Sequence, residues 1–158
     1  MATILVATDG SDLATNAAGR AVEVFGADHT YLVMTVVRPG LVTPNPMASF
    51  DAPGSAELQD EADSPTDMLL ANSAREESEA LAELDSLTRH LRIRAGRQVE
   101  MGDPGESICR VAREHHANVI VIGSHGRGRT RHLFVGSVSQ HVLQHAPCLV
   151  MVLGPQAG

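Results

Sequence analysis

Hydrophobic and polar positions divide the chain into short apolar runs separated by longer amphipathic segments. Five of the runs have the length of a buried strand, and glycine, proline or aspartate follows each of them within two residues. They predict strands over residues 3–8, 31–37, 94–101, 119–122 and 148–153. The run at 94–101 is the least apolar of the five, so it gives the weakest strand signal.

A helix is expected directly after the first strand. Ser11 or Asp12 can cap its first turn, and Gly26 is a suitable stop. Its apolar residues recur at helical spacing and form one face. They are Leu13, Ala17, Ala21 and Phe25.

A long helix is expected over residues 66–91. Apolar residues at steps of three, four and seven predict its buried stripe, namely Leu70, Ala74, Leu81, Leu84 and Leu91. Four glutamates fill the other faces, and we interpret them as the solvated side of the helix. They are Glu76, Glu77, Glu79 and Glu83.

Two further helices have clear boundary signals. For the third helix, Asp103 is the expected N-cap, Pro104 fits the first helical position, and Glu106 can reach back as in a capping box. The fourth helix is expected from Ser137 to His145, and Pro147 ends it.

Strands and helices thus alternate along the whole chain. This alternation predicts a doubly wound α/β fold with parallel strands joined by right-handed crossovers. A length of 158 residues suits a single domain over residues 1–158. Residues 39–65 are rich in proline and are expected to form a long loop inserted in that domain, either a lid or tolerated disorder.

Composition narrows the classes of protein to consider. With 43% hydrophobic residues, only 3% aromatics and no Trp, the core must consist of aliphatic side chains. A formal net charge of −7 disfavours nucleic acid and anionic membranes as partners. No signal peptide is visible and no apolar run could cross a bilayer, so a cytoplasmic protein is expected. Cys109 and Cys148 lie in apolar stretches and are expected to be buried thiols.

Candidate chemistry lies after the first and fourth strands. In open parallel sheets, ligands bind beyond the carboxyl ends of the strands, where the strand order reverses. Asp9, Gly10 and Ser11 follow the first strand, and Gly123 begins a glycine-rich stretch after the fourth. If these strands are neighbours, their loops face one crevice. Asp9 alone is equally well explained as a turn or cap residue, and Val36 alone as a core valine.

The stretch 123–139 favours an anion site over a plain capped turn. Gly136 and Ser137 would open the fourth helix, whose first N–H groups lack partners and attract anions. Ser137 and Ser139 add hydroxyl donors. The loop also carries a basic cluster, Arg127, Arg129 and Arg131, which suits a phosphate tail. The motif of a P-loop is absent, and Gly10 alone does not make a dinucleotide fingerprint.

The same stretch resembles the signature of the ATP-binding members of the universal stress protein family. The signature is Gly123-x-x-Gly126, nine residues, and then Gly136-Ser137. The similarity covers nearly the whole chain, including I-L-V-A-T-D-G-S at the start, M-T-V-V in the second strand, G-D-P before a helix, V-I-V-I-G-S-H-G, and A-P-C-L-V-M-V near the end. Two positions depart from the family pattern: Ala7 where many members carry Pro, and Thr35 where many carry His.

The resemblance implies a five-stranded sheet of order 3-2-1-4-5 with ATP, or AMP or ADP, between the first and fourth strands. Asp9 would hold the ribose hydroxyls, and Val36 would contact adenine through its backbone. Gly123 and Gly126 would line both the ribose and the phosphates. The phosphates would be bound by Gly136, Ser137, Val138 and Ser139. Arg127 is added as a phosphate contact from its charge.

The sequence also gives expectations about metal ions, the oligomeric state and alternative functions. Mg²⁺ would be held mostly by the phosphates. The eight histidines show no ligand spacing for a metal, although His141 and His145 can share a helix face. The resemblance implies a homodimer through the strand 148–153, a role as a stress-response binding module, and a further protein partner that stays unknown. Two alternatives stay open: a slow ATPase with His125 as base, and a scaffold dimer that binds no ligand.

Overall fold

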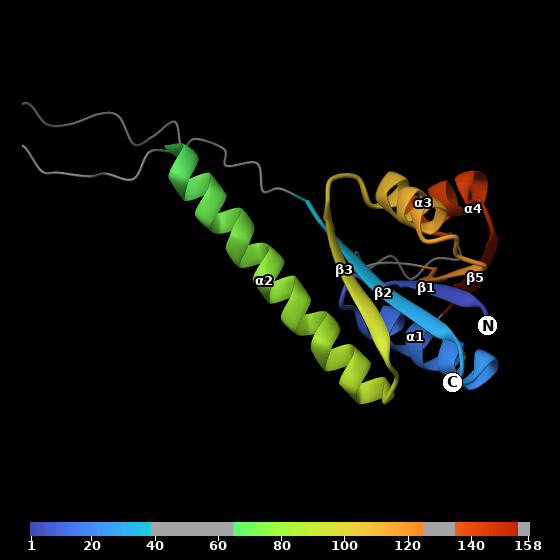
Figure 1. Cartoon of the computed structure of the whole chain (residues 1–158). Helices are drawn as coiled ribbons and strands as arrows, with labels where there is room; N and C mark the ends of the chain where they lie inside the picture. The colour runs from blue at the N-terminus through green and yellow to red at the C-terminus, as the bar shows by residue number, and fades with distance from the viewer. Residues whose placement is uncertain (39–64, 125–134, 155–158) are drawn as a thin grey trace, which may run out of the picture.

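Aliphatic runs form the strands and amphipathic segments form the helices, in strict alternation (Figure 1). The structure, a computed structural model, describes residues 1–38, 65–124 and 135–154. Its strands are β1 (Thr3–Ala7), β2 (Thr30–Val37), β3 (Ala95–Met101), β4 (Val119–Gly123) and β5 (Leu149–Leu153). Its helices are α1 (Asp12–Phe25), α2 (Pro65–Leu91), α3 (Pro104–Glu114) and α4 (Ser137–His145). The predicted element types are confirmed, and their bounds shift by about one residue, as terminal turns commonly do.

The strands form one parallel sheet in the order β3-β2-β1-β4-β5. Leu5 of β1 pairs with Leu32 of β2 on one side and with Ile120 of β4 on the other. The chain first builds outward from β1 to β3 and then crosses back to add β4 and β5. The order therefore reverses between β1 and β4, as expected, and the connections leave a crevice at their carboxyl ends.

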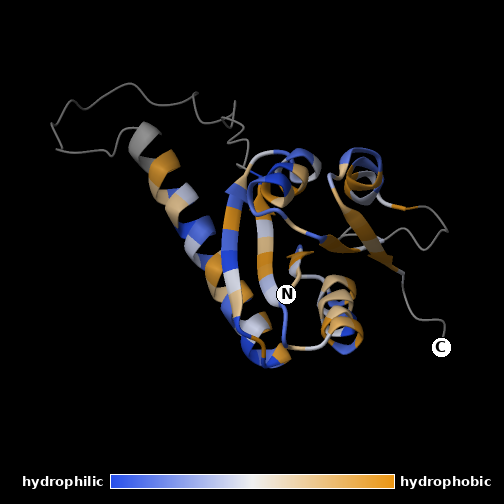
Figure 2. Ribbon diagram, turned by 45° about the vertical axis from the view of Figure 1, so that its right-hand side comes forward, coloured by the Kyte–Doolittle hydropathy of each residue, from blue (hydrophilic) through white to orange (hydrophobic). Residues whose placement is uncertain are grey.

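Two aliphatic cores cover the two faces of the sheet. Leu5, Met34 and Ile120 pack with α3 and α4, whereas Ile4, Val33 and Val121 pack with α1 and α2. This alternation is the period of two that a strand buried on both faces requires. In Figure 2 hydrophobic residues concentrate on the strands in the middle of the molecule, while bands of both kinds alternate along α2.

The expected caps fix where α1 and α3 begin. The Ser11 hydroxyl accepts a hydrogen bond of 3.2 Å from the Ala14 N–H, and the Asp103 carboxylate accepts one of 3.0 Å from the Glu106 N–H. Gly26 ends α1 with φ +80°, a conformation that a glycine adopts without strain. Both helices therefore start at the carboxyl edge of the sheet, beside the crevice.

The predicted buried stripe of α2 is partly wrong. Leu70 is 64% exposed and Leu81 is 39% exposed, whereas Ala80, Leu84 and Leu87 are buried. In Figure 1 the N-terminal half of α2 extends beyond the sheet, which explains the exposure of Leu70. In the C-terminal half the helix buries the face of Ala80, Leu84 and Leu87 and leaves Leu81 outside it. Within the expected loop 39–65, residues 39–64 lie outside the described residues, and Pro65 belongs to α2.

Candidate functional site

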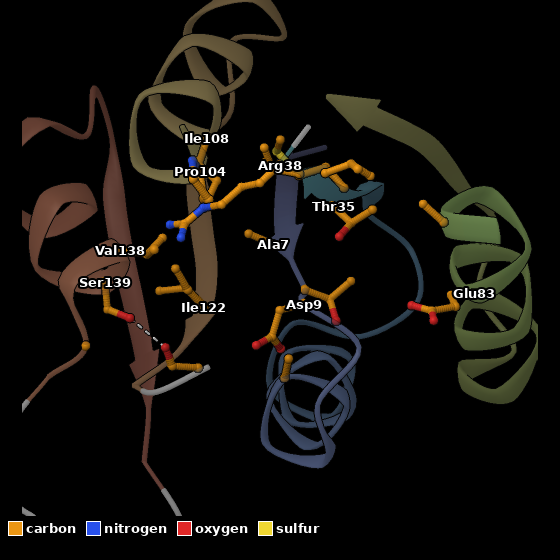
Figure 3. A pocket seen from close by; sticks show the side chains of 18 of the residues that line it. Ala7, Asp9, Thr35, Arg38, Glu83, Pro104, Ile108, Ile122, Val138 and Ser139 are labelled. Atoms are coloured by element: carbon orange, nitrogen blue, oxygen red, sulfur yellow. Dashed lines mark hydrogen bonds between the residues drawn. The ribbon is translucent and has the colours of Figure 1, made fainter. Parts of the chain in front are cut away.

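A cavity of about 770 Å³ opens at the carboxyl edge of the sheet, around the ends of β1, β2 and β4. Helices α2, α3 and α4 also contribute to its wall (Figure 3). Ala7, Met34 and Ile122 supply apolar surface from the strands. A cavity of this size, with apolar walls and a few polar groups, is typical of a site for a small organic ligand.

The backbone of Val36 offers the cavity one donor and one acceptor. The last bond between β1 and β2 runs from the Thr8 N–H to the Met34 carbonyl, at 2.9 Å. In a parallel strand alternate residues direct both their N–H and their C=O to the same neighbour. Val37 faces β3, because its carbonyl accepts a bond of 3.1 Å from the Gly102 N–H. Val36 therefore directs both groups into the space beyond the end of β1.

The N-terminus of α4 faces the same cavity. Gly136 is the N-cap in an extended conformation, and as a glycine it has no side chain that could cap this end of the helix. The first intrahelical bond runs from the Gln140 N–H to the Gly136 carbonyl, at 2.8 Å. The amides of Ser137, Val138 and Ser139 precede that bond, and all three residues line the cavity. Three such amides with the positive end of the helix dipole make a place for an anion.

Gly136 and Ser139 each make a hydrogen bond that holds α4 against the end of β4. The Gly136 N–H donates to the Ser124 carbonyl at 2.7 Å, and the buried Ser139 hydroxyl donates to the Gly123 carbonyl at 2.7 Å. From the sequence, the Ser139 hydroxyl is predicted to be a donor for the ligand. In the structure this hydroxyl instead donates to Gly123 and joins α4 to the end of β4. The group of Ser139 that remains for a ligand is its backbone amide.

Asp9 stands at the cavity from the turn after β1. One of its carboxylate oxygens accepts a 3.0 Å hydrogen bond from the Ser11 N–H, and the Thr8 hydroxyl accepts one of 3.1 Å from the Gly10 N–H. Gly10 has φ +76°, which explains a glycine at this position. Asp9 therefore shapes the turn and also lines the cavity (Figure 3).

The structure brings most of the sequence-predicted site residues to one cavity. Its wall includes Asp9, Val36, Gly123, Gly136, Ser137, Val138 and Ser139. Gly126 and Arg127 lie outside the described residues, as does His125, the candidate base of the ATPase alternative.

Sequence reasoning missed four charged residues of the wall. Glu76, Glu79 and Glu83 of α2 line the cavity, so interpreting them as the solvated side of the helix was incomplete. Their spacing of three and four places them on one helix face, which is the signal that could have found them. Arg38 also lines the cavity, and its position directly after a predicted strand at the carboxyl edge was the available clue.

The described residues include no metal-binding group of side chains, and their two thiols are protonated. No group of three or more His, Cys, Asp or Glu side chains there could hold a metal ion. His141 and His145 do share a face, but their rings stack with centroids 4.3 Å apart. Both cysteines are free; burial raises the pKa of the Cys109 thiol and of the half-buried Cys148 thiol, so each stays protonated near neutral pH.

The chain matches a family model over nearly its whole length, and it is similar to several curated proteins over part or most of their length. Residues 1–154 match the model of the universal stress protein family. Universal stress protein MJ0531 of Methanocaldococcus jannaschii is 28% identical over 95% of this chain and 80% of its own length. Universal stress protein Slr1101 of Synechocystis is 38% identical over 34% of this chain. That segment is 49% of Slr1101, less than two thirds of its length.

Solved structures share the fold at low sequence identity. Hypothetical protein MJ0577 has a TM-score of 0.78 at 18% identity, with 99% of this chain and 98% of that chain covered. A universal stress protein in complex with cAMP has a TM-score of 0.63 at 18% identity, covering 97% and 96%. A family protein of Arabidopsis thaliana with AMP bound has a TM-score of 0.59 at 18% identity, covering 99% and 94%.

Proposed function

Because the chain belongs to the universal stress protein family, we propose that it is a single-domain protein that binds adenine nucleotides, ATP foremost, as a module of a stress response. The observation that carries the proposal is the arrangement around one cavity. The Val36 backbone edge, Asp9 and the first amides of α4 all line it. A nucleotide has a base, a sugar and a phosphate chain that could pair with these three groups in turn.

The base end suits adenine. The Val36 N–H can donate to the N1 acceptor of adenine while its carbonyl accepts from the exocyclic amine. Met34, Ile108 and Ile122 provide apolar surface for the faces of the ring. A backbone edge makes these bonds whatever side chain the residue carries, so Val36 itself contributes mainly shape.

The sugar and phosphates follow from that position. Asp9 is an acceptor for ribose hydroxyls, and the amides of Ser137, Val138 and Ser139 are donors for phosphate oxygens. Mg²⁺ would accompany ATP. With no metal-binding group of side chains in the described residues, the phosphates themselves would supply most of its ligands.

Two of the solved neighbours favour this ligand class. One is described as a complex with cAMP and another as having AMP bound. Their identity to this chain is 18% each, so they share its fold, and the ligand is carried over here as a proposal. ATP rather than AMP is proposed from the first three amides of α4, which make no bond within the helix and can serve more than one phosphate group.

A single proline substitution tests the phosphate site without damaging the fold. Ser137 is the first residue of α4, and the preceding Gly136 is extended, with φ −62° and ψ 159°. Proline is favoured at this helix position and tolerates an extended predecessor. Ser137→Pro therefore removes one N–H from the cavity while the helix stays intact. Ser137→Ala is the matched control, because it removes the hydroxyl and keeps the amide.

We expect Ser137→Pro to weaken ATP binding by about tenfold, the value of one charge-assisted hydrogen bond. Isothermal titration calorimetry measures the affinity, and thermal unfolding should give similar midpoints for all three proteins. Heating purified wild-type protein should also release an adenine nucleotide into the supernatant. An empty supernatant together with no thermal shift on adding ATP would favour the scaffold alternative.

We further propose that the protein forms a homodimer through β5. This strand is at one edge of the sheet, and Leu149 at its start is 74% exposed. An uncovered edge strand invites pairing with another chain, and a second copy would satisfy it. Analytical ultracentrifugation should give a dimer that Leu149→Lys weakens; a wild-type monomer at all concentrations would reject the proposal.

A further inference from the structure

The charges around the cavity are divided between its two sides. Glu76, Glu79 and Glu83 approach from α2, while the α4 amides and Arg38 lie on the opposite side. Among the described residues that line the cavity, Arg38 is the one cation. An anion is therefore repelled from the α2 side and attracted to the α4 side, and this fixes the direction in which a nucleotide enters.

Arg38 is aimed at the α4 side. It follows the last residue of β2, two positions after Val36, whose side chain packs with the core under α3 and α4. Figure 3 shows the Arg38 side chain extending into the cavity toward Val138 and away from Glu83. The guanidinium group thus lies near the first turn of α4, brought there by a different element of the fold.

The Arg38 guanidinium has no hydrogen bond or ion pair with any residue that the structure describes. The other cavity charges include four carboxylates, Asp9 among them, yet none of these is its partner. A guanidinium group carries five donors in a planar fork that matches phosphate oxygens. Donors of this kind beside the first amides of a helix have the chemistry of a phosphate receptor.

Resting on the proposed nucleotide site, we propose that Arg38 is the side chain that makes this site select nucleotides over nucleosides. Its guanidinium group binds a phosphate oxygen together with the amides of α4. The α2 carboxylates oppose the reverse orientation of the ligand. Adenosine lacks the phosphate and gains nothing from Arg38, so the residue affects the ratio of affinities rather than the binding of the base.

The test compares AMP with adenosine on two variants. Arg38→Met keeps the length and the apolar stem of the side chain and removes its charge; Arg38→Lys keeps the charge and removes the fork. Arg94→Met is the matched control, because Arg94 is exposed just before β3, at the opposite edge of the sheet, and carries the same charge. Calorimetric titration gives both dissociation constants for each protein.

We expect Arg38→Met to weaken AMP by roughly tenfold while adenosine binds as before, Arg38→Lys to fall between, and Arg94→Met to match wild type. The salt dependence of AMP binding should also be shallower in Arg38→Met. An unchanged ratio of AMP to adenosine affinity overturns the inference. Tighter binding of both ligands also overturns it, because the side chain would then be filling the cavity.

The two proposals fail in different ways. If wild-type protein binds neither AMP, ATP nor adenosine, the nucleotide site itself is wrong and the role of Arg38 falls with it. If wild type binds AMP and Ser137→Pro weakens it, but Arg38→Met leaves the ratio unchanged, the nucleotide site stands and only the role of Arg38 is rejected.

Discussion

The hydroxyl of Ser139 donates a 2.7 Å hydrogen bond to the carbonyl of Gly123, and so ties the first turn of α4 to the last residue of β4. Ser139 is only 3% exposed, so water does not reach this carbonyl easily. The position of the α4 amides at the cavity therefore depends on a bond made behind them, inside the protein.

Ser139→Ala removes that donor and leaves a buried carbonyl unpaired. We expect the free energy of unfolding to fall by about 1–3 kcal/mol, because the carbonyl stays desolvated without a partner. Urea denaturation measures the loss. Ser137→Ala, at an exposed position two residues earlier, should stay within about 0.5 kcal/mol of wild type. Equal effects at the two serines would contradict a special role for the Ser139 bond.

Gly105 allows α3 and α4 to approach each other. A Cβ atom at this position would lie 2.8 Å from Cγ and Cδ2 of His141 and 3.0 Å from its Cβ. The Cβ and Cγ of His141 lie too near its backbone to swing away. We expect Gly105→Ala to cost about 1–3 kcal/mol of stability, the usual cost of overpacking.

The double variant Gly105→Ala/His141→Ala separates the clash from other effects of the alanine. Removing the ring gives the new methyl group room, so part of the lost stability should return. Urea denaturation of both single variants and the double variant completes the cycle. If the two losses simply add, the close approach of these residues does not limit position 105.

Asp9 has two tasks that a conservative substitution can separate. Asp9→Asn keeps the oxygen that accepts the Ser11 N–H, and it removes the negative charge that would bind ribose hydroxyls. We expect near wild-type stability and roughly tenfold weaker AMP binding. Titration with 2′,3′-dideoxy-AMP is the control, since it should bind both proteins alike. A similar loss with the dideoxy ligand would place Asp9 away from the sugar.

Glu100 makes part of the stability depend on pH. Burial raises the pKa of its carboxyl group, but hydrogen bonds from Gln98 and Arg110, with the Arg110 charge, outweigh burial and lower the pKa overall. A folded pKa below the unfolded one stabilises the protein above the unfolded pKa, about 4.3 for Glu, and this is lost as pH falls through the folded value. Glu100→Gln should therefore destabilise more at about pH 7 than at about pH 3. Equal losses in urea titrations at both pH values would contradict it.

Much of the fold follows from local pattern. The apolar runs gave the strands, and cap residues such as Ser11 and Asp103 gave the helix starts, because these signals involve only neighbours in the chain. The strand order came from the resemblance to the universal stress proteins and is confirmed. Alternation alone predicts parallel strands, but it does not order them.

The face that α2 buries could not be found in this way. Its sequence holds two overlapping stripes, one through Leu70 and Leu81 and another through Ala80 and Leu87, which share Leu84. Which stripe is buried depends on how the helix is rotated about its axis as it packs on the sheet, and that is a tertiary property. The same fact brought Glu76 and its neighbours to the cavity.

The site was predictable where backbone chemistry decides it, as at the start of α4. It was not predictable for Arg38, because only the folded chain shows that this side chain points into the cavity (Figure 3). Nor did the sequence reveal that the Ser139 hydroxyl faces inward.

The N-terminal half of α2 extends beyond the sheet, so the two halves of this helix should differ in their free energy of local unfolding. Residues of its second half, such as Leu84 and Leu87, share the core, whereas Leu69 and Leu70 in the first half are exposed. Amide hydrogens in the first half should therefore exchange with deuterium well before those near Leu84, since only local helix propensity protects them. Exchange followed by mass spectrometry should show protection rising along the helix; uniform protection would mean that another surface covers the overhang.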